Sequence, residues 1–546
     1  MDIRPHELYT RAGPPSDSPP RSRRAVSIAA AILALLAIAA LAVSNGGAGV
    51  ASETTDGDLA LAGVQAPGPD PGAKSVGGLL PSKKIVGALA SKNAASTTSA
   101  PPGSTKADAQ VTAARAVATT NATSGSSAVG APSGQGSPSV VASPSTTAVA
   151  GLVPAPTTTT APRTPPPSGG GSWTPTGPVY WLAADGNDAA SGTETAPWRS
   201  FPNAISRLHS GDNLLVKAGT YGSTATGPTV NVEGVNGAPG APITVAAAPG
   251  QQVNLLGGGW QVLRVASSSY IDIRGFDISG SAATERSTTD GIDVDRAHHV
   301  RLIANTVHDV GGGGINTIRA NHVTVDANRV FNTAMWNPNQ PSAISMFESA
   351  NIGGADNSDG FSFYVRNNVA YNNKNLVGAI TDGNCIIVDT NRQVGYSGAT
   401  YIANNLCYAN GGRGVHVVAS DNVLAVNNTL VGNLTSLQMS DQGELSANQA
   451  SSVSFRNNLV IPGRDGRGVR EYAASAISYA YNLYVGSAPE RRAGSDLVVT
   501  DARVGADYVP VAGSPAIDAG TTDGAPGTDR RGRARGGAPD IGCYEA

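Results

Sequence analysis

Cysteine is scarce in this chain: Cys385, Cys407 and Cys543 are the only three in 546 residues. Three cysteines are too few for a disulfide scaffold, and an odd number leaves at least one of them free. We therefore interpret them as small, buried apolar side chains. Because Cys385 and Cys407 are spaced by about one unit of the repeat described below, a disulfide between them stays open as an alternative.

Charge and aromatic side chains are also sparse. Charged residues make up 14% and aromatic residues 5% of the chain, and the formal net charge is −3. Since no basic patch interleaved with aromatic residues occurs, we expect no nucleic-acid partner. From Ser44 to Ser172 the chain is almost entirely Ala, Ser, Thr, Pro, Gly and Val. Such a segment cannot bury enough apolar surface to offset its ordering entropy, so residues 44–172 are predicted to be a disordered linker.

One long hydrophobic run occurs, at residues 25–43, directly after Arg21, Arg23 and Arg24. As a helix it would be about 28 Å long, which is enough to cross the hydrocarbon core of a bilayer. The preceding arginines predict that residues 1–24 stay in the cytoplasm. We expect a single-pass anchor with the C-terminal domain at the cell surface; the alternative is a cleaved export signal and a secreted domain.

An internal repeat dominates the rest of the chain. "GIDVDRAHHVRLIAN" (291–305) aligns with "GINTIRANHVTVDAN" (314–328), and the aligned asparagines recur at spacings of 23, 40, 37, 23 and 30 residues: Asn305, Asn328, Asn368, Asn405, Asn428 and Asn458. A 23-residue unit with period-2 apolar stretches is too short for a βαβ unit and predicts a coil of stacked parallel strands. The asparagines are expected to stack at one corner in left-handed backbone geometry, with glycines such as Gly291 at the next bend.

Three regions then carry a family resemblance. "VYWLAADGNDAASGTETAPWRSFPNAISRLHSGDNLLVKAGTY" (179–221) is similar to the opening segment of polysaccharide lyase family 9, the repeats resemble stacked coils, and 512–545 resembles the closing segment of secreted β-helix proteins. The chain thus resembles right-handed parallel β-helix proteins of the pectate-lyase-like superfamily. The resemblance implies an all-β, single-stranded solenoid over residues 173–546, with "PNAISRLHSGD" (202–212) in a short helix that caps its N-terminal end.

The repeat aligns the segments "GIDVD", "GINTI", "AISMF", "CIIVD" and "GVHVV" as one column of strands. Extra residues at 333–342, 349–362 and 391–399 flank this column, so their loops are predicted to wall a groove that suits a long polymer. The predicted outward side chains are Asp293, Asn316, Ser345, Ile387 and His416, with Asp295 and Asp389 one step farther along.

Acidic residues on this column suggest a calcium site. Asp290, Asp293 and Asp295 lie within six residues, and converging carboxylates would repel one another unless a hard cation such as Ca²⁺ joined them. Solvated acidic residues on an outer strand face are the alternative.

Candidate catalytic residues lie farther along the column. His416 would face the groove and move a proton, while Arg413 would grip a sugar carboxylate, with Asp421 nearby. Asp382 and Asp389 form the carboxylate pair that a glycoside hydrolase requires. The family 9 resemblance implies a lysine base near a calcium ion, but the chain after Trp173 has only Lys217 and Lys374, so Lys374 is a third candidate.

These features lead to three hypotheses. The first is an extracytoplasmic lyase that cleaves an acidic polysaccharide by calcium-assisted β-elimination, acting as a monomer. The second is a glycoside hydrolase, and the third is a non-catalytic module that binds glycan at the cell surface.

Overall fold

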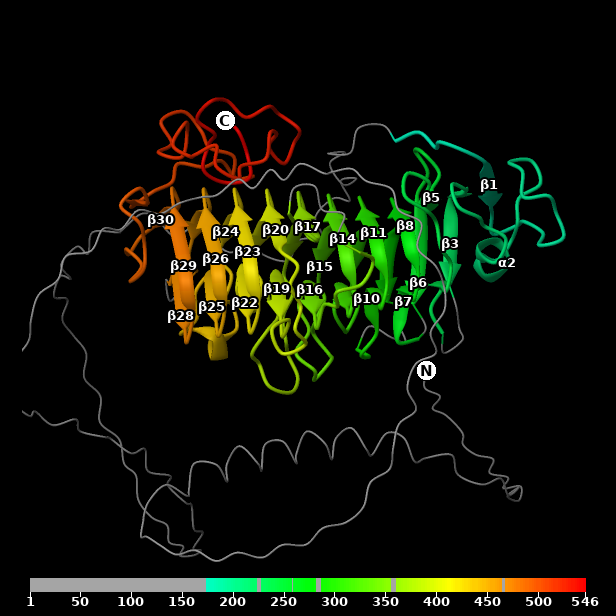
Figure 1. The fold of residues 1–546 in the computed structure, drawn as a ribbon, viewed down its shortest axis with the longest axis horizontal. Helices are drawn as coiled ribbons and strands as arrows, with labels where there is room; N and C mark the ends of the chain where they lie inside the picture. The colour runs from blue at the N-terminus through cyan, green and yellow to red at the C-terminus, as the bar shows by residue number, and fades with distance from the viewer. Residues whose placement is uncertain (1–172, 223–226, 258, 281–285, 355–359, 464–466) are drawn as a thin grey trace, which may run out of the picture. The chain divides into compact units, whose positions relative to one another are not determined.

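The computed structural model describes residues 173–222, 227–257, 259–280, 286–354, 360–463 and 467–546 (Figure 1). The predicted N-terminal segment (1–24), membrane segment (25–43) and linker (44–172) lie outside the described residues. Within the described ranges, no helix is both long and apolar enough to cross a membrane.

The described chain forms three parallel sheets, and apart from the first and last strands each coil of the chain adds one strand to each sheet. In sheet 1 the spatial order is β28 (Val469–Tyr472), β25 (Leu445–Asn448), β22 (Val415–Val418), β19 (Ile386–Asp389), β16 (Ile344–Phe347), β13 (Ile315–Ile318), β10 (Asp290–Asp295), β7 (Gln261–Ala266) and β4 (Val230–Glu233).

Sheet 2 follows sheet 1 in each coil. Its order is β1 (Val179–Leu182), β2 (Asn213–Val216), β5 (Ile243–Ala247), β8 (Ser269–Arg274), β11 (His298–Ile303), β14 (Asn321–Asp326), β17 (Phe363–Arg366), β20 (Thr400–Ala403), β23 (Asp421–Val426), β26 (Ser451–Arg456) and β29 (Ser475–Ala480).

Sheet 3 completes the coil. Its order is β3 (Gly219–Gly222), β6 (Val253–Gly257), β9 (Asp277–Gly280), β12 (Thr306–His308), β15 (Arg329–Phe331), β18 (Val369–Tyr371), β21 (Leu406–Tyr408), β24 (Thr429–Val431), β27 (Leu459–Ile461), β30 (Leu483–Val485) and β31 (Leu497–Val499). The predicted right-handed parallel β-helix is confirmed.

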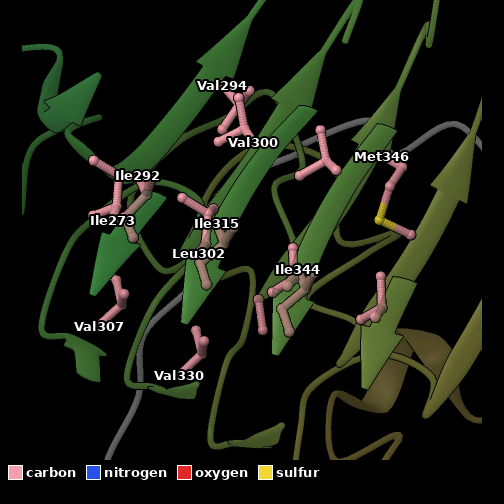
Figure 2. Close-up of a cluster of buried hydrophobic side chains, with 14 of the residues drawn as sticks. Ile273, Ile292, Val294, Val300, Leu302, Val307, Ile315, Val330, Ile344 and Met346 are labelled. Carbon is pink, nitrogen blue, oxygen red and sulfur yellow. The ribbon is translucent and has the colours of Figure 1, made fainter. Parts of the chain in front are cut away.

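The core lies between the three sheets, where alternate side chains of every strand meet. Ile292 and Ile315 from sheet 1, Val300 from sheet 2, and Val307 and Val330 from sheet 3 pack in the same interior and are fully buried (Figure 2). Burying one such side chain contributes about 2 kcal/mol. The period-2 pattern of the sequence therefore becomes one continuous core.

The predicted short helix at the N-terminal end is confirmed, but it spans only α2 (Phe201–Ile205) and not the whole of residues 202–212. Phe201, Ile205 and the following Leu208 are buried and belong to the main core cluster. The capping residues thus continue the apolar interior of the coils. At the other end of the chain, Ile541 packs with Leu459 and Leu483 of sheet 3 in a separate cluster.

The asparagine corner between sheets 2 and 3 is confirmed as a ladder of hydrogen bonds. Asn405 Nδ2 donates to Asn428 Oδ1 at 2.9 Å, and the Asn405 backbone amide donates to the same oxygen at 3.0 Å. The pattern repeats from Asn305 through Asn458 and extends to Asn482, which was not predicted. Every ladder asparagine is buried, so its amide replaces water as the partner of the corner backbone.

Two details of the corner differ from prediction. The left-handed residue is the one before each ladder asparagine, such as Ala304 (φ 55°) and Ala327 (φ 57°), so the asparagine is required for its amide and not for its backbone. The glycines at the starts of the sheet 1 strands, such as Gly291, do not have positive φ either. A Cβ at Gly291 would lie 2.3 Å from Val307 Cγ1, so this glycine is required by close packing.

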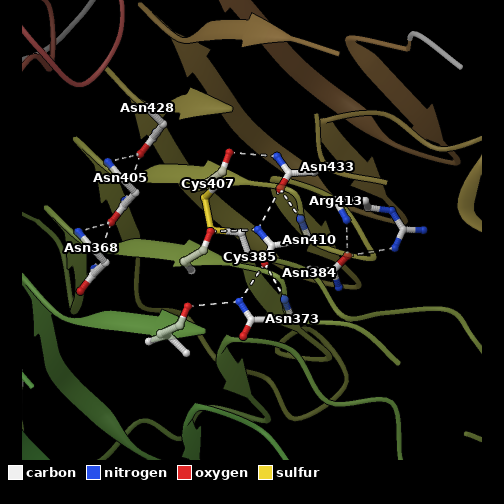
Figure 3. The surroundings of a disulfide bond; sticks show 12 residues. Asn368, Asn373, Asn384, Cys385, Asn405, Cys407, Asn410, Arg413, Asn428 and Asn433 are labelled. Atoms are coloured by element: carbon white, nitrogen blue, oxygen red, sulfur yellow. Dashed lines mark hydrogen bonds between the residues drawn. A yellow bond between two sulfur atoms is a disulfide. The ribbon is translucent and has the colours of Figure 1, made fainter. Parts of the chain in front are cut away.

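A second asparagine ladder, between sheets 3 and 1, was missed in the sequence. Asn373, Asn410 and Asn433 repeat the same bonding, and the ladder ends where Glu444 accepts bonds from the Asn433 amide (2.8 Å) and Nδ2 (2.7 Å). Burial raises the pKa of Glu444 to about 8. Cys385 and Cys407 form a disulfide that lies between the two ladders, so the apolar interpretation of these two cysteines was wrong (Figure 3). Cys543 is free and buried.

Candidate functional site on the outer face of sheet 1

The predicted column of sheet 1 has the predicted register. Asp293 pairs with Asn316, Asn316 with Ser345, Ser345 with Ile387, and Ile387 with His416. The residues before and after each of these five are fully buried in the interior, so the five side chains themselves lie on the outer face of the sheet. Asp389 lies one step farther along β19, in register with Phe347 and Val418.

Asp382, Arg413 and His416 form the most compact group of predicted catalytic residues. Asp382 Oδ1 lies 3.9 Å from Arg413 Nη1 and 3.9 Å from His416 Nδ1. Arg413 and His416 are 6% and 5% exposed, whereas the Asp382 side chain is 16% exposed. Asp382 therefore meets Arg413 and His416 of the next coil where the loop before β19 and the start of β22 lie side by side.

Two residues that the sequence did not single out hold Arg413 in place. The guanidinium donates from Nη2 to Gln442 Oε1 at 2.8 Å, and the Arg413 backbone amide donates to Asn384 Oδ1 at 2.8 Å. Asn384 in turn donates from Nδ2 to Asp382 Oδ1 at 2.7 Å (Figure 3 shows Asn384 beside Arg413). Ser342 is the residue aligned with Asn384 one coil earlier, and its hydroxyl oxygen accepts a hydrogen bond from Asn384 Nδ2. Alignment of the coils could therefore have identified Asn384 from the sequence.

The imidazole of His416 is buried without a hydrogen bond. Within the described part of the chain, neither Nδ1 nor Nε2 has a partner. Burial, and then the positive charge of Arg413, hold the pKa of His416 well below its usual range. The ring is therefore neutral, and one of its nitrogens is an unused proton acceptor.

The carboxylates beside this group have raised pKa values. Burial raises the pKa of Asp382 to about 6, although hydrogen bonding by Asn384 and the charge of Arg413 oppose it. Burial, together with the charge of Glu348, raises the pKa of Asp389. Asp389 accepts a bond from Thr390 Oγ1 at 2.6 Å. The negative charge of Asp389 also raises the pKa of Asp382.

The remaining predicted catalytic residues are less closely placed. Lys374 has its Cα about 3.0 Å from the position of a Cβ on Gly411, two residues before Arg413. Partial burial lowers the pKa of its amine. Asp421, predicted to lie with Arg413 and His416, instead begins β23 in sheet 2 and accepts a bond from Arg392 Nε at 2.9 Å. Asp421 therefore lies on a different sheet from His416 and pairs with Arg392.

The three predicted calcium ligands are only partly brought together. Asp290 accepts a bond from the Gly313 amide at 2.6 Å, and Asp293 accepts one from Asn316 Nδ2 at 2.9 Å. Burial and the mutual charge of Asp290 and Asp293 raise the pKa of Asp290, and burial raises that of Asp293. Asp295 lies 2.5 Å from Arg296 Nη2 and 3.6 Å from Arg264 Nη2.

These contacts do not fit a site of three carboxylates. In the ranges that the structure describes, no three His, Cys, Asp or Glu side chains gather closely enough to hold a metal ion. The aspartates are also remote from His416, because β10 and β22 are four strands apart in sheet 1. At about 4.8 Å per strand this is about 19 Å, so a cation at Asp290 and Asp293 cannot act on the same sugar as His416.

The comparisons with known proteins agree with this fold. Residues 180–385 match a family model described as "Pel9A-like, right handed beta helix region". The predicted family resemblance is confirmed. The match to the Pel9A-like region includes Asp290, Asp293 and Asp382 and ends before Arg413 and His416. No curated protein matches the chain.

Several solved structures of carbohydrate-active proteins are similar to the chain. Pectate lyase Pel9A is 20% identical, with 68% of this chain and 96% of that one covered and a TM-score of 0.41. A rhamnogalacturonan lyase is 14% identical, with 58% and 90% covered and a TM-score of 0.38. An alginate lyase from Paenibacillus sp. str. FPU-7 is 16% identical, with 52% and 95% covered and a TM-score of 0.30.

Proposed function

We propose that this protein is a polysaccharide lyase that cleaves an acidic glycan by β-elimination at the cluster of Asp382, Arg413 and His416. The observation that carries the proposal is the neutral, buried imidazole of His416, which has no hydrogen-bond partner among the described residues and lies beside a buried guanidinium. A buried polar group without a partner costs free energy, and a substrate that supplies the partner accounts for it.

In this mechanism each residue of the cluster has one role. Arg413 pairs with the carboxylate of a uronic acid unit and stabilises the negative charge that develops as C5 loses its proton. His416 accepts that proton as the base. The electron pair of the broken C5–H bond forms the C4–C5 double bond, and the C4–O bond breaks. The departing oxygen then takes a proton from the His416 imidazolium or from water.

Asp382 acts as a positioning residue. Its ionised carboxylate, 3.9 Å from Nδ1, favours the tautomer with the proton on Nδ1, which leaves Nε2 free to accept the substrate proton. Such contacts are often long before substrate binds and shorten in the complex. Because the imidazole of His416 is buried, the adjacent loops must open before a substrate can reach it. Opening would break the hydrogen bond from Arg413 to Gln442, which precedes β25.

Lys374 is the alternative base. Its lowered pKa increases the fraction of neutral amine, and its backbone lies against the turn before Arg413. If lysine is the base, substitution of Lys374 should abolish activity; if histidine is the base, substitution of His416 should. Single substitutions at the two positions therefore distinguish the two mechanisms.

We retain calcium binding as a separate proposal for Asp290 and Asp293. Two adjacent buried carboxylates with raised pKa values offer the oxygen ligands that a hard cation takes, with the Asn316 side chain beside them. Bound there, calcium would supply positive charge for an acidic unit of the polymer about 19 Å from His416. A calcium-dependent rise in thermal stability that Asp293→Asn abolishes would support it, whereas equal responses of both proteins would refute it.

Glycoside hydrolysis is the second candidate, and the raised pKa values of Asp382 and Asp389 favour it. A carboxylic acid with a pKa of about 6 can protonate a leaving oxygen near neutral pH while its partner stays ionised. In this mechanism Asp382 would be the acid, and the product would contain no double bond.

We propose that the domain works outside the cytoplasm on a polysaccharide. The disulfide between Cys385 and Cys407 supports an oxidising compartment, since such bonds are rare in reducing ones. The membrane anchor over residues 25–43, the linker and a monomeric state stay predictions. Intact mass of the exported protein distinguishes an anchor from a cleaved signal.

The test is turnover of uronic-acid polymers by the full chain, followed by the ultraviolet absorbance of unsaturated products. His416→Gln should lower kcat/KM by about 10² to 10⁴-fold. His209→Gln is the matched control, because His209 is highly exposed and lies in the N-terminal cap.

New reducing ends without ultraviolet absorbance would favour the hydrolase. Loss of lyase activity in Lys374→Met, together with full activity in His416→Gln, would favour lysine as the base. No turnover on any polymer would refute both and favour a binding module.

A further inference from the structure

A cavity of about 810 Å³ opens on the outer face of sheet 2, a different face from that of His416. Its floor includes residues of β8, β11 and β14, and its walls include Trp173, the turn at 238–242 and the segment at 361–364. This volume lies within the usual range for sites that hold small ligands. The catalytic proposal uses none of these residues.

Three stacked rings form part of the floor. The rings of Tyr270 and His299 have centroids 4.4 Å apart with an interplanar angle of 13°, and those of His299 and His322 have the same separation with an angle of 14°. His322 Nε2 donates to the Gly354 carbonyl at 2.8 Å, and the Nδ1 atoms of His298 and His299 lie 2.7 Å apart in a hydrogen bond. The ring stack is therefore held in place before any ligand arrives, which reduces the entropy cost of binding.

The ring stack occupies an unusual backbone position. Tyr270, His299 and His322 have φ values of 55°, 55° and 49°, a left-handed conformation that costs a residue other than glycine about 1 kcal/mol. The register places Asn422, Ser452 and Ala476 at the same position of later strands, with φ values of 60°, 54° and 53°. The left-handed position thus belongs to the fold, but aromatic rings occupy it at the cavity and small or polar residues occupy it elsewhere.

The charged groups lining the cavity compensate one another. Arg301 donates from Nε to Asp272 Oδ1 at 2.6 Å and from Nη2 to Asp272 Oδ2 at 2.5 Å. Arg301 is 46% exposed, so its remaining N–H groups can reach a ligand, and the hydroxyl of Thr324 lines the same space. A nucleic acid would need an excess of positive charge to neutralise its phosphates, and this lining does not provide one.

We propose that this cavity is a second carbohydrate site, which binds a neutral stretch of glycan without cleaving it. Because the stacked rings cover one another's facing surfaces, a sugar packs its C–H groups against the ring atoms that line the cavity. Its hydroxyl groups pair with donors such as the outer N–H groups of Arg301 and with the Thr324 hydroxyl. The site lies on sheet 2, whereas the catalytic cluster lies on sheet 1, so glycan binding here does not require turnover at His416.

The test is calorimetric titration of the full chain with short neutral oligosaccharides of glucan, xylan, mannan and galactan type. His416→Gln is present throughout to prevent turnover. At least one neutral oligosaccharide should bind, and Tyr270→Ala should weaken its Kd about tenfold. Tyr270→Phe, which keeps the ring, should bind like the parent. Ser452→Ala is the matched control, because it changes the equivalent left-handed position outside the cavity.

Three results would overturn the proposal. The first is that no neutral oligosaccharide binds. The second is that Tyr270→Ala and Ser452→Ala weaken binding equally. The third is that only uronic-acid oligomers bind and that Tyr270→Ala leaves their affinity unchanged. Binding of a nucleic acid or a peptide in place of the sugars would also overturn it. None of these results depends on lyase activity, so failure here is distinguishable from failure of the catalytic proposal.

Discussion

His416 Nδ1 lies 3.9 Å from Asp382 Oδ1, and both groups are close to the guanidinium of Arg413. Burial drives the pKa of the imidazole far down and that of the carboxyl up to about 6. The imidazole is therefore neutral near neutral pH, and Asp382 is the group of this pair that titrates near pH 6.

The first prediction is that lyase activity rises with pH through about 6. Below this pKa Asp382 is protonated and no longer favours the reactive tautomer of His416; above it the carboxylate is ionised and activity levels off. The measurement is kcat/KM against pH for a uronic-acid polymer, which reports groups of the free enzyme. Asp382→Asn should lower the plateau and remove the step near pH 6.

The hydrolase mechanism predicts the opposite dependence. There Asp382 must be protonated to act as the acid, so kcat/KM would fall as pH rises through about 6. A falling profile, or a rising step that survives in Asp382→Asn, would contradict the role of Asp382 as an ionised positioning group.

The second prediction concerns the ladder between sheets 2 and 3. Asn405→Ala should lower the free energy of unfolding by about 3 kcal/mol, because it leaves the buried backbone and side-chain amides of Asn368 without their acceptor. The Asn405 Oδ1 atom accepts from both the Asn368 amide and Asn368 Nδ2, and its Nδ2 donates to the Val365 carbonyl.

Denaturant unfolding of the variant measures this loss. Asn339→Ala is the control, since Asn339 is an exposed asparagine in the loop before β16 and should change stability by less than about 0.5 kcal/mol. Equal effects of the two variants would mean that the ladder amides contribute no more than surface asparagines.

The sequence contained enough information for the coil and its corner. The spacing of Asn305 and Asn328 and the alternation around Val323 have only one stacking that buries the apolar side chains, so fold, register and the outward row could be predicted. The second ladder was missed although Asn373, Asn410 and Asn433 each follow an asparagine of the first ladder by five residues. In other coils the same position holds Val310, Thr333 or Gly463, so the asparagine does not recur through the whole repeat.

The site was less predictable, because side-chain partners depend on three-dimensional contacts. Asp293 and Asp295 alternate onto one face as expected, but ion pairs with two arginines occupy Asp295. Asp421 was likewise placed by its closeness in sequence to His416, although the chain turns from sheet 1 into sheet 2 between them. Sequence position indicates which face a side chain takes, whereas competing partners decide what it contacts.

The third prediction is that the disulfide stabilises the middle coils. It closes a loop of 22 residues, so the paired substitution Cys385→Ala with Cys407→Ala should lower the free energy of unfolding by about 3 kcal/mol. Thermal unfolding of the oxidised protein and the double variant tests this. Intact mass after alkylation of the denatured, non-reduced protein should show one modified thiol, Cys543, and three modified thiols would contradict the pairing.

The last prediction is a loss of stability at alkaline pH that depends on His308 in sheet 3. Burial lowers the pKa of this imidazole, but hydrogen bonds to Asp277 (2.8 Å) and Asp309 (2.7 Å) outweigh it and raise the pKa to about 9. The ring also stacks on Phe331, with centroids 4.9 Å apart. The folded state therefore binds the proton more tightly than the unfolded state, whose histidine has a pKa of about 6.5.

The resulting stabilisation is fully present below about pH 6.5 and is lost as pH rises through about 9. Because Asp309 is half exposed, its magnitude is on the order of 2 kcal/mol. His308→Gln should lower the free energy of unfolding by this amount at pH 6 and much less at pH 10, as measured by urea unfolding. His209→Gln should have a small effect at both values, since His209 is highly exposed. If His308→Gln lowered the free energy of unfolding equally at pH 6 and pH 10, the prediction would be wrong. His308 would then stabilise the fold by packing against Phe331 and not through its charged hydrogen bonds.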